Sequence, residues 1–423
     1  MARNVLVLGG GGREHALTWA LARSASVAEV ASAPGNPGTA TLGPTHAIDA
    51  EDPAAVVALA KRLGTDLVVV GPEAPLVAGV VDALAAAGIA AFGPPAAAAA
   101  IEGSKAFAKE VMAAAGAPTG GAVATSDRDE AYAALERFGG PYVVKADGLA
   151  AGKGVRICAD LAEARDAVDD ALVRGVFGPA GSRVVIEEFL AGPERSVFGV
   201  CDGTEVVLLE PAQDYKRALD GDAGLNTGGM GAYTPVPGFA LADVDHLKDL
   251  VFRPVLAELA DRGTPYRGLL YAGLVETAAG PKLLEFNARF GDPETQAIVP
   301  RVASDLGELL WAAATSTVAG HEVAWRSEAA VTVVLASGGY PGSYPTGVPI
   351  SGVDAAAALP DVEVFHAGTR REEQGQLVTA GGRVLAVTAL GADVSAARDR
   401  AYEAAERVTF DGVHRRSDIA AGV

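Results

Sequence analysis

The sequence predicts a multidomain protein of mixed α/β and α+β class that begins with a doubly wound parallel sheet. The chain has 423 residues, which is too long for one ordinary hydrophobic core. In residues 1–103 short apolar runs alternate with helical patterns, as in a parallel sheet covered by helices. After residue 104 strands and helices follow an α+β order, and the chain ends in a small mixed domain.

The N-terminal domain is expected over residues 1–103. Its strands are short apolar runs at 4–8, 27–33, 67–70 and 89–93, and helical patterns follow the first strand and occupy 53–63 and 76–87. Two prolines before an alanine-rich helix, PPAAAAAIEGSK, mark its end. Because the carboxyl ends of parallel strands share one edge, we expect the loops GGGG, PGN and GPE to lie together there.

Three further units are predicted. Residues 104–120 and 188–325 form a larger α+β unit, 121–187 a smaller one, and 326–423 the C-terminal domain. The expected strands are 141–146, 154–158 and 183–187 in the smaller unit, 194–201, 204–210, 268–276 and 281–287 in the larger one, and VTVVLAS, VEVFHAG and RVLAVTAL in the last. The expected helices are 127–138, 160–173 and 395–407.

The charge of the chain disfavours two classes of partner. It has 34 Lys and Arg against 53 Asp and Glu, a net charge of −19, so we expect neither nucleic acid nor an anionic membrane as a partner. No apolar run reaches the roughly 18 residues of a membrane span. Cys158 and Cys201 lie in strand-like runs, which predicts buried free thiols and a reducing cytoplasm. We expect a monomer without an obligatory protein partner.

The first glycine-rich loop, GGGGREH at 9–15, favours a phosphate or phosphosugar ligand. It offers backbone N–H groups at a helix N-terminus, and Arg13 adds positive charge. A dinucleotide site is an alternative, but the G-x-G-x-x-G pattern fails in both registers, at Glu14 and at His15. A tight turn without a ligand is the third interpretation.

The second glycine-rich stretch, VKADGLAAGKGV at 144–155, predicts a hairpin that covers an anion. It is not a P-loop, because only three residues separate Gly148 from Gly152 and no Ser or Thr follows Lys153. One strand ends at Lys145 and the next is GVRIC. Its glycines let backbone amides approach phosphates, with which the lysines pair. A flexible hairpin with solvated lysines is the alternative.

The stretch KLLEFNARFGDPETQ, 282–296, carries the strongest polar cluster. Alternate residues of a strand share a face, so Glu285, Asn287 and Arg289 are expected on one side and the apolar residues, from Leu284 onward, on the other. A carboxylate and an amide oxygen are hard ligands suited to Mg²⁺ that bridges phosphates. An arginine beyond them suits a carboxylate or a transferring phosphoryl group. A surface strand is the alternative, against which the acidic turn GDPET argues.

A series of motifs gives the chain a resemblance to a known family. In chain order they are GGREHAL (11–17), VGPEAPL (70–76), FGP (92–94), EGSKAF (102–107), KADGLAAGKGV (145–155), VIEEFL (185–190), NTGGMGAY (226–233), EFNARFGDPETQ (285–296), GGYPG (338–342), FHAGT (365–369) and GGRVLAVTALG (381–391). In this order they resemble the ATP-grasp ligases and, among these, the glycinamide ribonucleotide synthetases. The resemblance runs from end to end, with departures at Gly10 and in 217–225.

The resemblance implies an ATP-grasp central region and a role for each motif there. Lys105 and Lys145 would contact the ATP phosphates, and a loop with Gly148, Gly152, Lys153 and Gly154 would cover them. Glu187, Glu188 and Leu190 would line the adenine, largely through backbone groups, and Glu194 would take the ribose hydroxyls. Glu285 and Asn287 would hold Mg²⁺ or Mn²⁺.

The resemblance also implies the substrates, glycine and 5-phosphoribosylamine. Gly11, Gly12, Arg13 and Glu14 would bind the phosphoribosyl group. The reacting centre would be surrounded by Lys216, Asn226, Gly228 and Asp292, with Arg289 and Asp214 as catalytic residues. The implied reaction passes through glycyl phosphate. Three other functions stay open: an ATP-grasp enzyme for another acid and amine, a dinucleotide-dependent oxidoreductase, and a non-catalytic nucleotide-binding protein.

Overall fold

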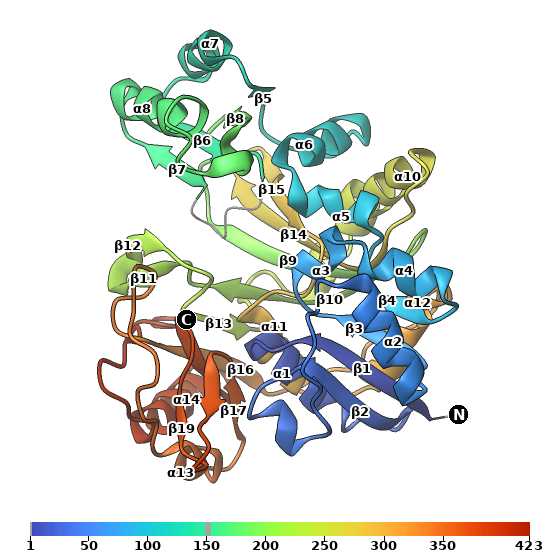
Figure 1. The fold of residues 1–423 in the computed structure, drawn as a ribbon. Helices are drawn as coiled ribbons and strands as arrows, with labels where there is room; N and C mark the ends of the chain where they lie inside the picture. The colour runs from blue at the N-terminus through green and yellow to red at the C-terminus, as the bar shows by residue number, and fades with distance from the viewer. Residues whose placement is uncertain (1, 149–153) are drawn as a thin grey trace.

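The computed structural model describes residues 2–148 and 154–423, arranged around three main sheets (Figure 1). Gly152 and Lys153, at the turn of the predicted hairpin, lie outside the described residues. The predicted fold class is confirmed: a parallel N-terminal sheet precedes a mixed α/β central region and a C-terminal region.

The N-terminal sheet is parallel throughout. In spatial order its strands are β2 (Val27–Pro34), β1 (Arg3–Gly9), β3 (Leu67–Val70) and β4 (Ala90–Phe92). Its helices are α1 (Gly12–Leu21), α2 (Pro53–Leu63), α3 (Glu73–Val77) and α4 (Val80–Ala86). The single helix expected at 76–87 was wrong, because Gly79 adopts φ +84° and separates α3 from α4.

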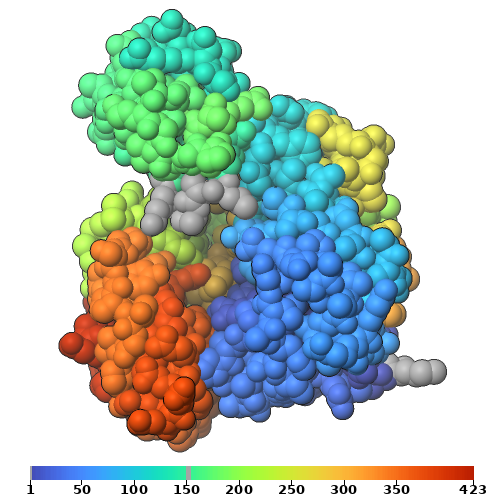
Figure 2. Space-filling model, viewed as in Figure 1, coloured from blue at the N-terminus to red at the C-terminus, as the bar shows by residue number. Residues whose placement is uncertain are grey.

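Residues 121–187 contain a small antiparallel sheet with its own hydrophobic core. The strand order is β5 (Ala122–Thr125), β8 (Val184–Glu187), β6 (Tyr142–Ala146) and β7 (Val155–Cys158), packed with α7 (Arg128–Phe138) and α8 (Leu161–Leu172). This unit projects as a lobe from the rest of the molecule (Figure 2). Helices α5 (Ala96–Gly103) and α6 (Lys105–Ala114) lead into it from the N-terminal domain.

The central and C-terminal regions share one eight-stranded sheet. Its order is β15 (Gly280–Asn287), β14 (Arg267–Thr277), β9 (Glu194–Asp202), β10 (Val206–Asp214), β13 (Gly231–Thr234), β16 (Ala329–Ala336), β20 (Arg383–Gly391) and β17 (Val362–His366). The unpredicted β13 pairs with β10 on one side and β16 on the other. The boundary proposed at residue 326 therefore separates strands of a continuous sheet.

Smaller elements complete these regions. Two short ribbons are formed by β11 (Arg217–Leu219) with β12 (Ala223–Asn226), and by β18 (Thr369–Arg371) with β19 (Leu377–Thr379). The remaining helices of the described chain include α9 (Leu241–Val244), α10 (Arg253–Asp261), α11 (Glu294–Ile298), α12 (Leu306–Ala314), α13 (Val353–Ala357) and α14 (Val394–Arg407).

The alternation expected in β15 holds after Glu285 and fails before it. Phe286 and Ala288 are buried in the main core, while Glu285 and Asn287 are half-buried. The register shifts just before Glu285, and Leu283 enters the core in place of Leu284. The expected position of Leu284 on the core face was therefore wrong.

Cys158 and Cys201 are buried free thiols, as predicted. In the part of the chain that the structure describes, no helix combines the length and apolar character needed to cross a membrane.

Replacing Gly268 of β14 with Ala is expected to destabilise the protein by more than the backbone strain of the substitution would cause alone. Its Cβ would lie 2.9 Å from the Gly93 Cα of the N-terminal domain, whereas a Cβ at Gly280 would meet nothing within 4 Å. Both glycines have positive φ, +128° and +105°. Overpacking costs about 1–3 kcal/mol, so Gly268→Ala should lower the free energy of unfolding by about that much more than Gly280→Ala in urea titrations. Equal losses would contradict a tight contact between these regions.

Candidate functional site

Charged side chains from four parts of the chain converge beside β15. Lys105 begins α6, Lys145 lies on β6, Lys216 follows β10, and Glu285 is on β15. Burial opposes ionisation of Glu285, but Lys216, Lys145 and Lys105 outweigh it, so the pKa of this carboxyl lies below its usual range. The structure thus brings the predicted phosphate-binding lysines close to a predicted metal ligand.

A buried carboxylate, Glu187, holds two lysines in place. Its Oε1 lies 2.9 Å from Lys145 Nζ, and its Oε2 lies 3.0 Å from Lys109 Nζ. All three side chains are at least nine-tenths buried. The side chain of Glu187 is therefore occupied by lysines. Sequence reasoning missed Lys109, although it lies four residues after Lys105 and so on the same helix face.

The start of α6 is bonded to the base of the predicted hairpin. Asp147 Oδ1 accepts from Ser104 Oγ at 2.9 Å and from the Ala106 N–H at 2.7 Å. Lys105 Nζ donates to the Gly148 carbonyl at 3.2 Å. A Cβ on Gly148 would lie 2.7 Å from Ala180 Cβ, so this glycine is needed for close packing. These bonds fix the direction of the Lys105 side chain.

The other predicted nucleotide-binding residues lie near this cluster with different contacts. Glu188 Oε2 accepts from the Gly121 N–H at 3.0 Å. Leu190 lies near Gly120, since a Cβ there would meet Leu190 Cδ2 at 3.3 Å. Glu194 lies at the start of β9, where its Oε2 is 3.1 Å from Lys216 Nζ. Gly154 is buried, and its carbonyl accepts from the Ala146 N–H at 2.8 Å.

The predicted metal ligands offer oxygen atoms that no described residue occupies. Among residues 2–148 and 154–423, neither the Glu285 nor the Asn287 side chain makes a hydrogen bond or ion pair. In the same ranges no group of three or more His, Cys, Asp and Glu side chains suits a metal ion. Two hard oxygen ligands fit a divalent cation whose other positions are filled by phosphate oxygens and water.

Arg289 joins β15 to the N-terminal domain. Its Nη2 lies 2.9 Å from Glu102 Oε1, and its Nε lies 3.3 Å from Glu73 Oε2. Glu102 also accepts from the Ala288 N–H at 2.7 Å. Burial raises the pKa of Glu102, although Arg289 opposes that shift. Neither glutamate was predicted as a site residue, and the catalytic role of Arg289 stays a prediction.

A second cluster of carboxylates lies around Asp214. Burial raises the pKa of Asp214 and the charges of Glu294 and Glu194 add to this, while Lys216 opposes it. Glu294 is itself buried and accepts from Tyr271 Oη at 2.8 Å. An aspartate with a raised pKa is suited to accept a proton. That Asp214 and Lys216 belong to the reacting centre stays a prediction.

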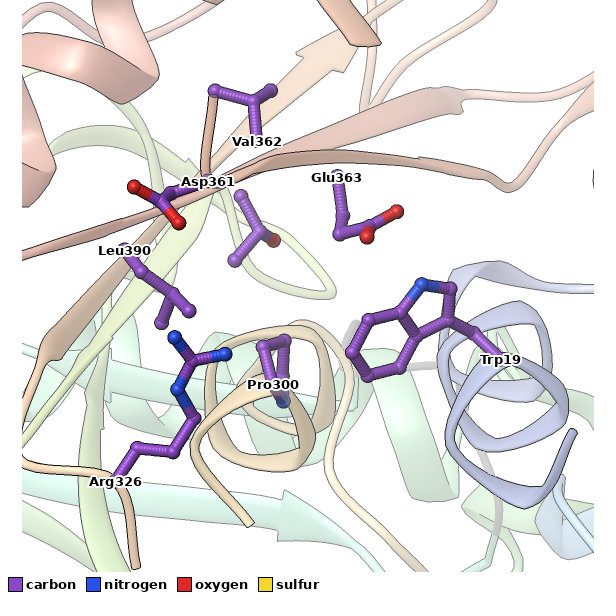
Figure 3. Close-up of a pocket in the computed structure, with 8 residues that line it drawn as sticks. Trp19, Pro300, Arg326, Asp361, Val362, Glu363 and Leu390 are labelled. Carbon is purple, nitrogen blue, oxygen red and sulfur yellow. The ribbon is translucent and has the colours of Figure 1, made fainter. Parts of the chain in front are cut away.

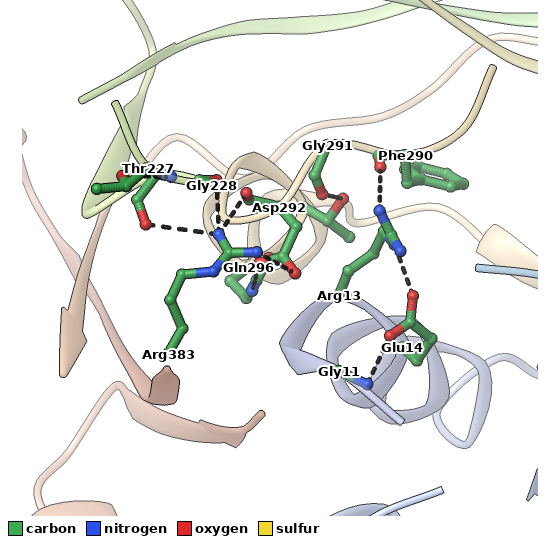
Figure 4. A network of polar contacts seen from close by, with 12 residues as sticks. Gly11, Arg13, Glu14, Thr227, Gly228, Phe290, Gly291, Asp292, Gln296 and Arg383 are labelled. Carbon is green, nitrogen blue, oxygen red and sulfur yellow. Dashed lines mark hydrogen bonds and ion pairs between the residues drawn. The ribbon is translucent and has the colours of Figure 1, made fainter. Parts of the chain in front are cut away.

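The first glycine-rich loop is closed around the side chain of Glu14 (Figure 4). Glu14 Oε2 accepts from the Gly11 N–H at 2.6 Å, and Oε1 lies 2.6 Å from Arg13 Nε. Arg13 Nη1 donates to the Phe290 carbonyl at 3.1 Å. A Cβ on Gly12 would lie 2.6 Å from Gln296 Nε2. A side chain at this position would therefore displace the Gln296 amide, whatever ligand the loop binds.

Asn226, Gly228 and Asp292 lie at the junction with the C-terminal region. Asn226 pairs with Arg217 across the exposed β11–β12 ribbon. Arg383 Nη1 donates to the Gly228 carbonyl at 2.6 Å, and Arg383 Nη2 lies 3.0 Å from Asp292 Oδ2 (Figure 4). Arg383 lies in the motif GGRVLAVTALG, but the sequence predicted no role for this residue.

A separate hollow of about 220 Å³ lies between α1 and the C-terminal strands (Figure 3). None of the predicted site residues lines it. Its lining residues include Trp19, Arg326, Asp361 and Glu363. Its charged groups have partners elsewhere: Arg326 lies 2.9 Å from Glu328, and Asp361 lies 3.1 Å from Arg400. The converging lysines, and not this hollow, are the candidate functional site.

Comparison with known proteins identifies the family of the chain. Models of the phosphoribosylglycinamide synthetase N domain, ATP-grasp (A) domain and C domain match residues 3–102, 103–295 and 330–422. The chain belongs to the phosphoribosylglycinamide synthetase family. It is 55% identical to the phosphoribosylamine–glycine ligase of Streptomyces coelicolor over 420 residues, which cover 99% of this chain and 98% of the relative.

Two further relatives support this membership. The chain is 50% identical to the phosphoribosylamine–glycine ligase of Mycobacterium bovis, with 98% of this chain and 97% of the relative covered. The crystal structure of the Thermotoga maritima phosphoribosylamine–glycine ligase is 35% identical, with a TM-score of 0.86, and covers 98% of this chain and 100% of that one. The resemblance inferred from the motifs is therefore confirmed.

Two buried histidines join the first loop to the C-terminal region. His15 Nδ1 accepts from the His366 N–H at 2.7 Å, and the ring centroids are 5.6 Å apart. Burial, with His366 nearby, lowers the pKa of His15 to about 3. Burial, with Arg371 nearby, lowers the pKa of His366 to about 4. Both rings therefore stay neutral in the folded protein well below their usual pKa.

Acidification is expected to destabilise the fold through these histidines. Between the ordinary pKa of about 6.5 and the lowered folded values, the unfolded chain binds more protons, so stability falls as pH falls. Each histidine should contribute a slope of up to about 1.4 kcal/mol per pH unit. Urea unfolding from pH 7 to 4.5 should show a smaller slope for His15→Gln and His366→Gln. Equal slopes in wild type and both variants would contradict the prediction.

Proposed function

We propose that this protein ligates glycine to 5-phosphoribosylamine, with ATP as the energy source, to give glycinamide ribonucleotide, ADP and phosphate. One observation carries the proposal: Lys105, Lys145 and Lys216 converge on Glu285 in a chain that belongs, from end to end, to the phosphoribosylglycinamide synthetase family. The relatives at 50–55% identity are named phosphoribosylamine–glycine ligases.

On the nucleotide side, we assign the phosphates to Lys105 and Lys145. Both are held before ATP arrives, by Gly148 and by Glu187, so little ordering remains for binding. Glu285 and Asn287 would hold a divalent cation, Mg²⁺ or Mn²⁺, which neutralises phosphate charge when bound. The backbone from Glu187 to Leu190 would line the adenine, since the Glu187 side chain is committed to lysines.

On the substrate side, the glycine carboxylate attacks the γ-phosphorus, and the bond to ADP breaks. The product, glycyl phosphate, is then attacked at its carbonyl carbon by the phosphoribosylamine nitrogen, and phosphate leaves. The nitrogen loses a proton in this step, and Asp214 is a suitable acceptor because its pKa is raised. The 11–14 loop and the 226–228 loop would hold the phosphoribosylamine and glycine.

Three finer statements remain proposals of the same kind. We propose that the enzyme acts as a monomer and works in the cytoplasm, where the two buried free thiols stay reduced. We also propose the unit boundaries at 103, 120, 187 and 325 as those of its working parts. The core of the 121–187 unit supports treating that unit separately.

The activity is tested by ADP release with ATP, Mg²⁺ and phosphoribosylamine generated in situ, screened against a panel of amino acids. We expect release that depends on both glycine and phosphoribosylamine, and we expect Glu285→Gln to lose turnover while its unfolding midpoint stays near wild type. Release with another amino acid, or without phosphoribosylamine, would select a different ATP-grasp reaction. A change in nicotinamide absorbance would select an oxidoreductase.

Arg289→Lys is expected to lower turnover although it keeps the charge. Lysine cannot present the planar fork that meets Glu102 and Glu73, and loss of a preorganised donor typically costs on the order of 10²–10³ in rate. Single-turnover ADP formation at saturating ATP and glycine measures this effect, beside nucleotide titration. Glu102→Gln is the matched variant, because it removes the ion pair with Glu102 from the other side and keeps the pair with Glu73. If both variants lose only stability, Arg289 is a structural joint and not a catalytic residue.

A further inference from the structure

Two motifs of the C-terminal region, GGYPG and GGRVLAVTALG, have no part in the reaction described above. The structure places one side chain from each, Tyr340 and Arg383, on the same residue of the 226–229 loop. The Gly228 N–H donates to Tyr340 Oη at 2.9 Å, and the Gly228 carbonyl accepts from Arg383 Nη1 at 2.6 Å. Both backbone groups of Gly228 are thus held by the C-terminal region.

The same guanidinium reaches the turn that follows β15. Arg383 Nη1 donates to the Asp292 carbonyl at 2.7 Å, and Nη2 lies 3.0 Å from Asp292 Oδ2 (Figure 4). Burial opposes ionisation of Asp292, but Arg383 and then Arg13 keep the pKa of this carboxyl below its usual range. One side chain therefore joins two segments that are far apart in the sequence.

The contact leaves no free space between the joined segments. A Cβ on Gly228 would lie 2.9 Å from Arg383 Cζ, and a Cβ on Gly229 would lie 2.3 Å from Pro293 Cδ. Asp292 Oδ1 also accepts from Gln296 Nε2 at 2.7 Å, and that amide packs beside Gly12. The contacts of Arg383 thus continue to the loop assigned to the phosphoribosyl group.

We propose that Arg383 is a positioning residue of the acceptor site, which fixes the 226–229 loop against Asp292 while Tyr340 holds the N–H side of that loop. The proposal rests on the function proposed above. If Arg383 has this role, the C-terminal region helps to bind glycine and phosphoribosylamine and takes no part in ATP binding. Lysine cannot replace Arg383, because a single ammonium does not reproduce two planar donors directed at a carbonyl and a carboxylate.

The test compares Arg383→Lys and Tyr340→Phe with matched controls. Arg370 is an exposed residue of the same region, and Tyr142 lies in the 121–187 unit, so Arg370→Lys and Tyr142→Phe change the same chemistry away from Gly228. We expect Arg383→Lys to lower kcat/KM for glycine and phosphoribosylamine by about 10²-fold, the loss that small misplacement of reacting groups produces. Tyr340→Phe should lower it less, and neither variant should alter ATP binding. Both controls should behave as wild type.

Two results would overturn the proposal. Normal kcat/KM for both substrates in Arg383→Lys would show that the contact positions nothing. Weaker ATP binding together with a lower unfolding midpoint would show that Arg383 has a merely structural role. If Arg383→Lys does not fold, Tyr340→Phe decides the question by the same two readouts. Rescue of Arg383→Ala by added guanidinium ion would support the proposal. Wild type without glycine-dependent ADP release would refute the proposed function itself, a separate outcome.

Discussion

The turn that leaves β15 depends on polar bonds supplied by both the N-terminal and the C-terminal regions of the chain. Glu102 accepts from the Ala288 N–H at 2.7 Å, Arg13 donates to the Phe290 carbonyl at 3.1 Å, and Arg383 pairs with Asp292 at 3.0 Å. None of these partners is local in sequence. A buried polar group left without a partner costs about 1–3 kcal/mol, so the N-terminal and C-terminal regions fix the course of this turn.

This constraint connects the two halves of the proposed reaction. Glu285 and Asn287, which would hold the cation, lie on the strand that runs directly into the turn. Asp292, at the other end of the turn, lies against the 226–229 loop. A shift at either end is therefore transmitted along a few residues of backbone that have little freedom. Catalysis by positioning requires such rigidity, because phosphoryl transfer offers little covalent chemistry for the protein to perform.

The features that the sequence predicted correctly are those that follow from short periodicities and from glycine-rich loops. The two-residue period placed Glu285 and Asn287 opposite Phe286, and alternating strands and helices predicted the parallel sheet. The sequence did not predict Glu102 or Arg383, because a partner 186 or 91 residues away from its contact leaves no local pattern. The shift before Glu285 and the four-residue β13 were missed for a related reason: cross-strand pairing, and not intrinsic preference, stabilises them.

The net charge of −19 does not oppose the binding of an anionic nucleotide as strongly as it first suggests. At physiological ionic strength exposed charges are screened over about 8 Å, so a phosphate at the site is governed by its neighbours. Those neighbours are lysines that carboxylates already hold: Lys145 by Glu187, and Lys216 by Glu194. Burial nevertheless lowers the pKa of Lys105, and Glu285 offsets this only in part. Added negative charge is therefore favourable at Lys105, which is the electrostatic basis for phosphate binding in an acidic protein.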